Sequence, residues 1–100
     1  MSPLVRVVKM TFQKDKIPEF LALFEKTRIQ IRNFPGCQHL QLLEEHGGTG
    51  VMMTYSHWDS EEALNNYRDS ELFGEVWAQT KPLFSEKPMA WSLDQRYKMP

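Results

Sequence analysis

The sequence predicts an α+β fold of the ferredoxin-like type, with element order β-α-β-β-α-β and a four-stranded antiparallel sheet. Short apolar stretches alternate with two longer amphipathic segments, and a glycine-rich loop separates the second and third stretches. The length of 100 residues fits one domain. We therefore expect a single domain over residues 1–100, with its core at about 4–93 and a tail at 94–100.

The first two elements are a strand and a helix. Leu4–Phe12 has apolar residues at both odd and even positions, which indicates a strand buried on both faces. Asp15–Phe34 is predicted to be a helix, because Pro18 is tolerated in a first turn and Pro35 and Gly36 end the pattern. Its predicted inward face consists of Ile17, Phe20, Leu21, Phe24, Ile31 and Phe34.

The middle of the chain is predicted to be a hairpin. Cys37–Glu45 and Val51–Trp58 are the strands, and His46–Gly50, which contains three glycines, is the loop. In the first of these strands, simple alternation places Leu40 and Leu42 on one face. It places the following residues on the other: Cys37, His39, Gln41 and Leu43.

A second helical region follows the hairpin. Asp59 is predicted to cap its start, with Glu62 three residues later. Asp69 and Ser70 are a second cap signal, so we expect a break there. Pro82 should end the region, and Met89–Leu93 is the last predicted strand.

The two predicted helices can cover only one face of the predicted sheet. The first strand, however, has apolar residues on both of its faces. The chain also has six Met, six Phe, three Trp and three Tyr, a large inventory for one small core. A second copy of the chain, related by a two-fold axis, would cover the open face. We therefore expect a homodimer.

Charge and cysteine content exclude several classes of protein. Twelve Lys and Arg balance thirteen Asp and Glu, which disfavours a nucleic-acid binder. No apolar run approaches the ~20 residues of a membrane span, and no signal peptide is recognised. The single cysteine, Cys37, excludes an internal disulfide, and the histidines are not spaced as metal ligands. We expect a cytoplasmic protein with no metal and an inert, buried thiol.

Three segments carry a family resemblance. They are Phe34-Pro35-Gly36-Cys37 with the strand 40–43, the stretch 55–64 around Trp58-Asp59-Ser60-Glu61-Glu62, and the stretch 65–73. Together they resemble the antibiotic biosynthesis monooxygenase (ABM) family over essentially residues 4–93. The resemblance implies a dimeric α+β barrel in which each protomer has a small pocket between its sheet and its helices.

The resemblance leaves several functions open. It favours a cofactor-independent monooxygenase acting on a small phenol- or quinol-like aromatic substrate. The alternatives are a non-catalytic dimeric binding or stress-related domain, and an isomerase of small metabolites. Haem degradation is disfavoured, because the helical positions used by that branch hold Tyr67 and Trp77 and its first-strand Asn corresponds to about Val8. No cofactor is expected.

Candidate site residues follow from chemistry and resemblance. Tyr67 and Asn66 could stabilise a developing oxyanion, and His57 could transfer a proton. Residues expected to bind the substrate are Trp77, Phe73, Tyr55, His39 and Trp91. The competing interpretation is that the aromatic residues are plain core and the strand histidines belong to the surface or an interface. If Tyr67 and Trp77 interdigitate with no void, the catalytic hypothesis fails.

Other motifs do not support a site. Ser56 and His57 are adjacent on a strand and point to opposite faces, so they cannot form a hydrolase pair. The glycines at 47–50 lack the Lys of a phosphate-binding loop. Arg28 and Arg32 share a helical face and could hold an anion, but pairing with an acid such as Glu25 is the simpler expectation.

Overall fold

The computed structural model describes residues 3–100 and has the predicted order of strands and helices. The four strands form one antiparallel sheet in the order β2-β3-β1-β4. The elements are β1 (Leu4–Thr11), η1 (Lys14–Lys16), α1 (Ile17–Arg32), β2 (Cys37–Glu44), β3 (Val51–Trp58), α2 (Glu61–Arg68), α3 (Glu71–Thr80), η2 (Lys81–Leu83) and β4 (Met89–Asp94). The ferredoxin-like α+β fold is confirmed.

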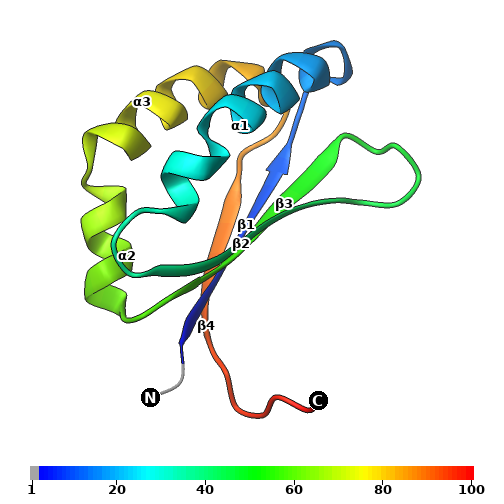
Figure 1. Cartoon of the computed structure of the whole chain (residues 1–100). Coiled ribbons are helices and arrows are strands. Elements are labelled where there is room, and N and C mark those ends of the chain that lie inside the picture. The colour runs from blue at the N-terminus through cyan, green and yellow to red at the C-terminus, as the bar shows by residue number, and fades with distance from the viewer. Residues whose placement is uncertain (1–2) are drawn as a thin grey trace.

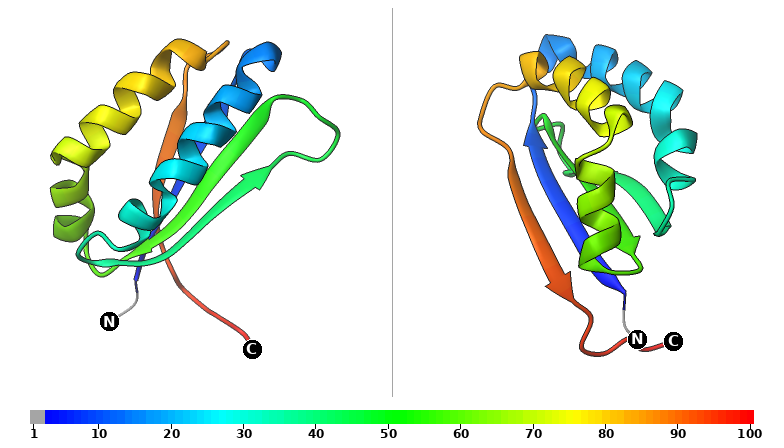
Figure 2. Two further views of the ribbon diagram at one scale, coloured as in Figure 1. Left: turned by 45° about the horizontal axis from the view of Figure 1, so that its top comes forward. Right: turned by 90° about the vertical axis from the view of Figure 1, so that its left-hand side faces the viewer.

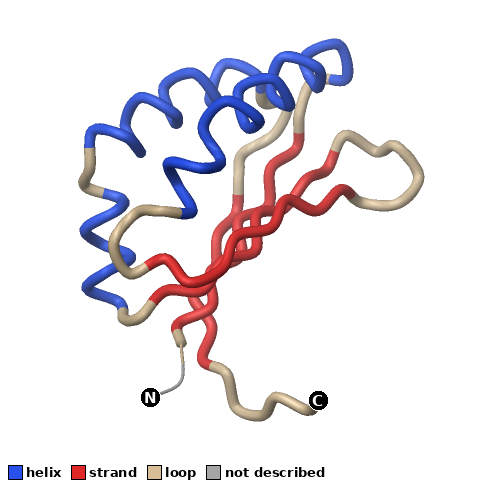
Figure 3. Tube along the Cα trace, in the orientation of Figure 1, coloured by secondary structure: helices blue, strands red, loops and turns tan. Residues whose placement is uncertain are grey.

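All three α-helices lie on one side of the sheet (Figures 1 and 3). Side views show α1 and α3 lying next to each other over the strands, with α2 at the end near the chain termini (Figure 2). No element of residues 3–100 covers the opposite face, which we call the open face. Side chains on β1 therefore alternate between the helix-facing side and the open face.

The long helix α1 follows the predicted pattern with one exception. Pro18 occupies the first turn and Asn33 caps the end, its backbone N–H bonding to the carbonyl of Ile29. Phe20 and Ile31 are buried. Leu21 is 42% exposed, so its predicted inward position is wrong, because it lies just outside the packed stripe. No helix among the described residues is long and apolar enough to cross a membrane.

The break between α2 and α3 is confirmed. Ser70 is the N-cap of α3, and its hydroxyl oxygen accepts a hydrogen bond from the Phe73 N–H at 3.1 Å. The same hydroxyl donates to the carbonyl of Tyr67 at 2.6 Å, which joins the two helices. At the start of α2 the prediction of Asp59 as cap is wrong by one residue. Ser60 is the cap and accepts from the Ala63 N–H at 3.1 Å.

A β-bulge near the start of β2 changes which residues share a face. Cys37 pairs with Trp58 and His39 pairs with His57, so one extra residue of β2 lies between these pairs. Cys37 consequently packs on the helix-facing side, in a buried cluster with Trp58 and Leu64. The prediction that Cys37 shares a face with His39 is wrong for this reason, while its burial at 4% exposure is as expected.

The core is divided between the two ends of the molecule. One buried cluster consists of Met10, Phe12, Phe20, Met52 and Leu83. The other consists of Cys37, Trp58 and Leu64, with Phe34 and Tyr67 packed against it. The space between these two clusters, under α2 and α3, is not filled by side chains.

Candidate functional site

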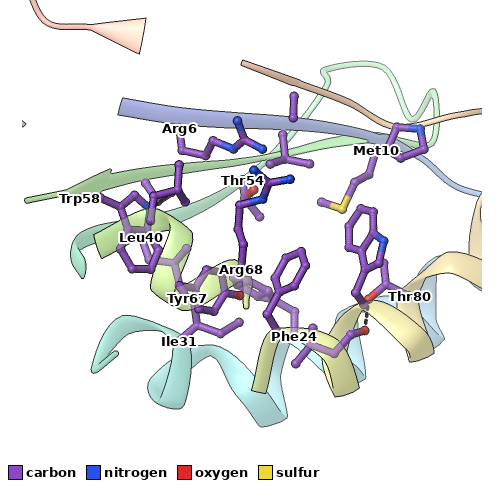
Figure 4. Close-up of a pocket in the computed structure, with 18 of the residues that line it drawn as sticks. Arg6, Met10, Phe24, Ile31, Leu40, Thr54, Trp58, Tyr67, Arg68 and Thr80 are labelled. Carbon is purple, nitrogen blue, oxygen red and sulfur yellow. Dashed lines mark hydrogen bonds between the residues drawn. The ribbon is translucent and has the colours of Figure 1, made fainter. Parts of the chain in front are cut away.

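A cavity of about 290 Å³ lies between the helices and the helix-facing side of the sheet. Figure 4 shows side chains from the strands and helices converging on it. Its lining includes Arg6, Val8, Met10, Phe20, Phe24, Ile31, Leu40, Thr54, Ser56, Trp58, Leu64, Tyr67, Arg68, Phe73, Val76, Trp77, Thr80, Pro88, Met89 and Ala90. A cavity of this size approaches the range that holds small organic ligands.

Aromatic rings form a continuous wall along one side of the cavity. Trp58 stacks on Tyr67 with ring centroids 5.0 Å apart, and Tyr67 meets the edge of Phe73 at 5.2 Å. Phe73 stacks on Trp77 at 5.7 Å, and Trp77 contacts Phe84 at 5.6 Å. The aromatic residues therefore contact one another along this wall, and the cavity of about 290 Å³ lies beside them.

Two of these aromatic residues have buried polar groups. The Trp58 indole is 1% exposed, and its N–H donates a hydrogen bond to the Ser56 hydroxyl at 3.0 Å. Burial raises the pKa of the Tyr67 hydroxyl far above its usual range, and the Cys37 side chain adds to the effect. Tyr67 is therefore a neutral phenol at physiological pH and can donate a hydrogen bond into the cavity.

The cavity has an apolar depth and a more polar mouth. Met10, Phe20 and Trp58 are buried at its inner wall. Arg68 and Ala90 are exposed where it opens, between α2 and β4. Among the lining residues of the described chain, 3–100, Arg6 and Arg68 are the only side chains with a formal charge at neutral pH, and none is a histidine or a carboxylate.

The predicted site residues divide between the two faces of the sheet. Tyr67, Phe73 and Trp77 line the cavity together. Asn66 is exposed on α2 and outside the lining. The remaining candidates alternate onto the open face: His39 on β2, Tyr55 and His57 on β3, and Trp91 on β4. The sheet therefore separates the open-face candidates from the cavity, and their assignment to a functional site stays a prediction.

The open-face residues form a cluster of their own. The rings of His39 and His57 are 4.9 Å apart, and Tyr55 lies 5.0 Å from His57. Nε2 of His57 is buried with no hydrogen-bond partner among the described residues. Burial lowers the pKa of His57, and the positive charges of His39 and Lys98 lower it further. His57 is consequently held neutral at physiological pH.

Sequence reasoning missed the two arginines at the mouth. A usable signal was present on β1, where Arg6 shares the helix-facing side with Leu4, Val8 and Met10. A cation in an apolar row of a central strand needs a reason to be there. Arg68 carried no comparable signal, since a basic residue in the last turn of a helix is ordinary.

The arginines of α1 and the single cysteine lie outside the cavity lining. Arg28 pairs with Glu25 at 3.2 Å, as predicted. Arg32 donates to the backbone carbonyl of Cys37 at 2.8 Å. Burial raises the pKa of the Cys37 thiol, which keeps it protonated. Residues 3–100 contain no group of three or more His, Cys, Asp or Glu side chains that could hold a metal ion.

The comparison with family models agrees with this architecture. The model described as antibiotic biosynthesis monooxygenase matches residues 3–79. The chain belongs to this family. No protein of curated function matches it significantly.

Solved ABM-like structures share the fold across nearly the whole chain. A Caulobacter crescentus CB15 protein provisionally named as an antibiotic biosynthesis monooxygenase is 24% identical, with a TM-score of 0.88 over 96% of this chain and 92% of that one. A conserved protein from Methanosarcina mazei Go1 is 17% identical and has a TM-score of 0.90 over 96% of this chain and 95% of that one. Rv0793 from Mycobacterium tuberculosis is 20% identical and has a TM-score of 0.86 over 99% of this chain and 100% of that one. At these identities the likeness establishes the fold alone.

Proposed function

We propose that this ABM protein is a cofactor-independent monooxygenase that oxidises a small phenol- or quinol-like aromatic substrate in the cavity between sheet and helices. The observation that carries the proposal is the aromatic wall of Trp58, Tyr67, Phe73 and Trp77 around a space of about 290 Å³. Flat aromatic ligands stack well on such walls, and an apolar interior limits the access of water.

The chemistry requires an electron-rich substrate anion that reacts with O₂. Loss of a proton from a phenolic or enolic substrate gives a carbanion, O₂ adds to it, and the protonated hydroperoxide then loses water to leave a carbonyl group. The neutral hydroxyl of Tyr67 donates to the developing oxyanion in this scheme. His57 and Asn66 have no role in it, because neither side chain lines the cavity.

A specific observation favours a second candidate function. The lining has no histidine or carboxylate to act as general base. A non-catalytic, dimeric binding domain would need none. An isomerase using His57 with Tyr67 finds no support in this geometry, since the sheet lies between them.

Oxygen uptake against a panel of anthrones and hydroquinones tests the oxygenase. Tyr67→Phe should lower kcat/KM by about 10- to 100-fold, the effect of losing one hydrogen bond to a charged oxygen. Tyr97→Phe is the matched control, because Tyr97 is 88% exposed near the C-terminus. Saturable binding without oxygen uptake across the panel would favour the binding domain.

A homodimer through the open face is part of the same proposal. Leu43, Trp91 and Leu93 lie on that face and are 38–48% exposed. Trp91→Glu should shift the mass in sedimentation equilibrium toward one chain, while Ile29→Glu on α1 should not. A monomeric wild type at micromolar concentration would refute the dimer. A cytoplasmic location, supported by the lone unpaired cysteine, completes the proposal.

A further inference from the structure

The mouth of the cavity brings two like charges together without an acidic partner. Arg6 projects from β1 on the helix-facing side, and Arg68 is the last residue of α2. Figure 4 shows the Arg68 side chain extending across the cavity toward the strand that carries Arg6. Both line the same cavity.

Neither guanidinium is neutralised within the described part of the chain. The single ion pair found among residues 3–100 joins Arg28 to Glu25 within α1, and it includes neither Arg6 nor Arg68. Arg6 donates one hydrogen bond, to the neutral hydroxyl of Ser92 at 3.0 Å. A guanidinium has five N–H donors, so most of the donors of Arg6 and Arg68 remain free for another group.

This arrangement of two like charges is electrostatically unfavourable. Burial and the nearby charge of Arg68 both lower the pKa of Arg6, which means that its charged form is destabilised where it lies. Two cations facing one apolar cavity are relieved by an anion placed between them. Charge-assisted hydrogen bonds from guanidinium to oxyanions are among the strongest available to a protein.

We propose that the cavity selects an anionic ligand, an aromatic molecule whose body lies against Tyr67 and Trp77 and whose negatively charged oxygen group lies between Arg6 and Arg68. The ligand class is an aromatic carboxylate or an ionised phenol or enol. This inference rests on the proposed function of the cavity as a binding site for a small aromatic molecule. It also compensates for the absence of a base in the lining, since two cations lower the pKa of a bound phenol, which then loses its proton to solvent water.

A pair of isosteric ligands separates charge recognition from apolar binding. Naphthalene-2-carboxylate and naphthalene-2-carboxamide have nearly the same shape and differ in charge. Isothermal titration of the full chain near pH 7 should give at least tenfold tighter binding of the carboxylate, the effect of one charge-assisted hydrogen bond. Arg6→Gln and Arg68→Gln should each reduce that ratio toward one, with little change in the affinity for the amide.

One control variant keeps the positive charge at the cavity, and the other removes a positive charge outside it. Arg6→Lys should preserve most of the preference, and Arg96→Gln, an equal charge change at an exposed residue outside the cavity, should leave the ratio unaltered. Far-ultraviolet circular dichroism shows whether each variant is folded. Equal wild-type affinity for acid and amide would overturn the anion preference and leave the aromatic site standing. Failure of both ligands to bind would overturn the proposed function and this inference together.

A phenol that reports its own ionisation gives a second measurement. The phenolate of para-nitrophenol absorbs visible light, so its apparent pKa when bound can be read directly. Wild-type protein should lower that pKa by about one unit, a tenfold shift toward the anion, and Arg68→Gln should reverse much of it. An unchanged or raised pKa in the wild-type complex would contradict the proposal.

Discussion

The hydrogen bond between Trp58 and Ser56 offers a quantitative test of how the cavity wall is held. The Trp58 indole is 1% exposed, Ser56 is 5% exposed, and the N–H donates to the hydroxyl at 3.0 Å. Ser56→Ala removes the acceptor and leaves the buried N–H without a partner. Such a loss costs about 1–3 kcal/mol. At 4–8 °C per kcal/mol for a chain of this size, a cost of about 2 kcal/mol lowers Tm by about 8–16 °C.

A double-mutant cycle isolates this bond from other effects of the substitution. Trp58→Phe removes the donor, so adding Ser56→Ala in that background should cost less than about 0.5 kcal/mol. Urea unfolding of the wild type, the two single variants and the double variant, all at the same protein concentration, measures the cycle. A Ser56→Ala protein as stable as wild type would mean that another acceptor satisfies the indole. A protein equally destabilised in both backgrounds would mean that the cost does not come from this bond, and either result would contradict the prediction.

Two further predictions concern the open face and the turn before β2. The pKa of His57 is lowered in the folded chain, so the unfolded chain binds more protons as the pH falls. The free energy of unfolding should therefore be highest above about pH 6.5 and should decline below it. Thermal melts from about pH 7 to pH 5 should show a smaller fall in Tm for His57→Gln than for wild type. His46→Gln should show the same fall as wild type, and an equal fall in all three proteins would contradict this role of His57. Gly36 has φ +90°, and an added Cβ would lie 2.5 Å from Cβ of Ala63. Gly36→Ala should destabilise the fold by about 2 kcal/mol or more. Gly47 has φ +105° and open space around an added Cβ, so Gly47→Ala should cost about 1 kcal/mol. Equal costs for the two substitutions would show that the contact with Ala63 is unimportant.

Local signals in the sequence were sufficient for most of the fold. The break between α2 and α3 was predictable because Ser70 follows Asp69 in the middle of a helical pattern and a cap acts within its own turn. The position of β1 between two other strands was predictable because its apolar residues fall on both faces. These features depend on neighbours in sequence, so no tertiary information was needed.

The parts that could not be predicted depend on packing between distant segments. The bulge in β2 exists where Cys37 packs with Trp58 and Leu64, and alternation alone gives no hint of the extra residue. Periodicity placed Tyr67 and Trp77 on the inward face but cannot say whether inward side chains meet or leave a space. Alternation along β3 likewise could not decide whether His57 faces the cavity or the open face, because it does not show which set of alternate residues the helices cover.

The three tryptophans of the chain provide the most direct test of where a ligand binds. Trp58 and Trp77 line the cavity, and Trp91 lies on the open face. Indole N–H resonances of ¹⁵N-labelled protein, assigned by single Trp→Phe variants, can be followed during titration with naphthalene-2-carboxylate. Saturable shifts are expected for Trp58 and Trp77, and none for Trp91. Shifts confined to Trp91 would place the ligand on the wrong side of the sheet and contradict it.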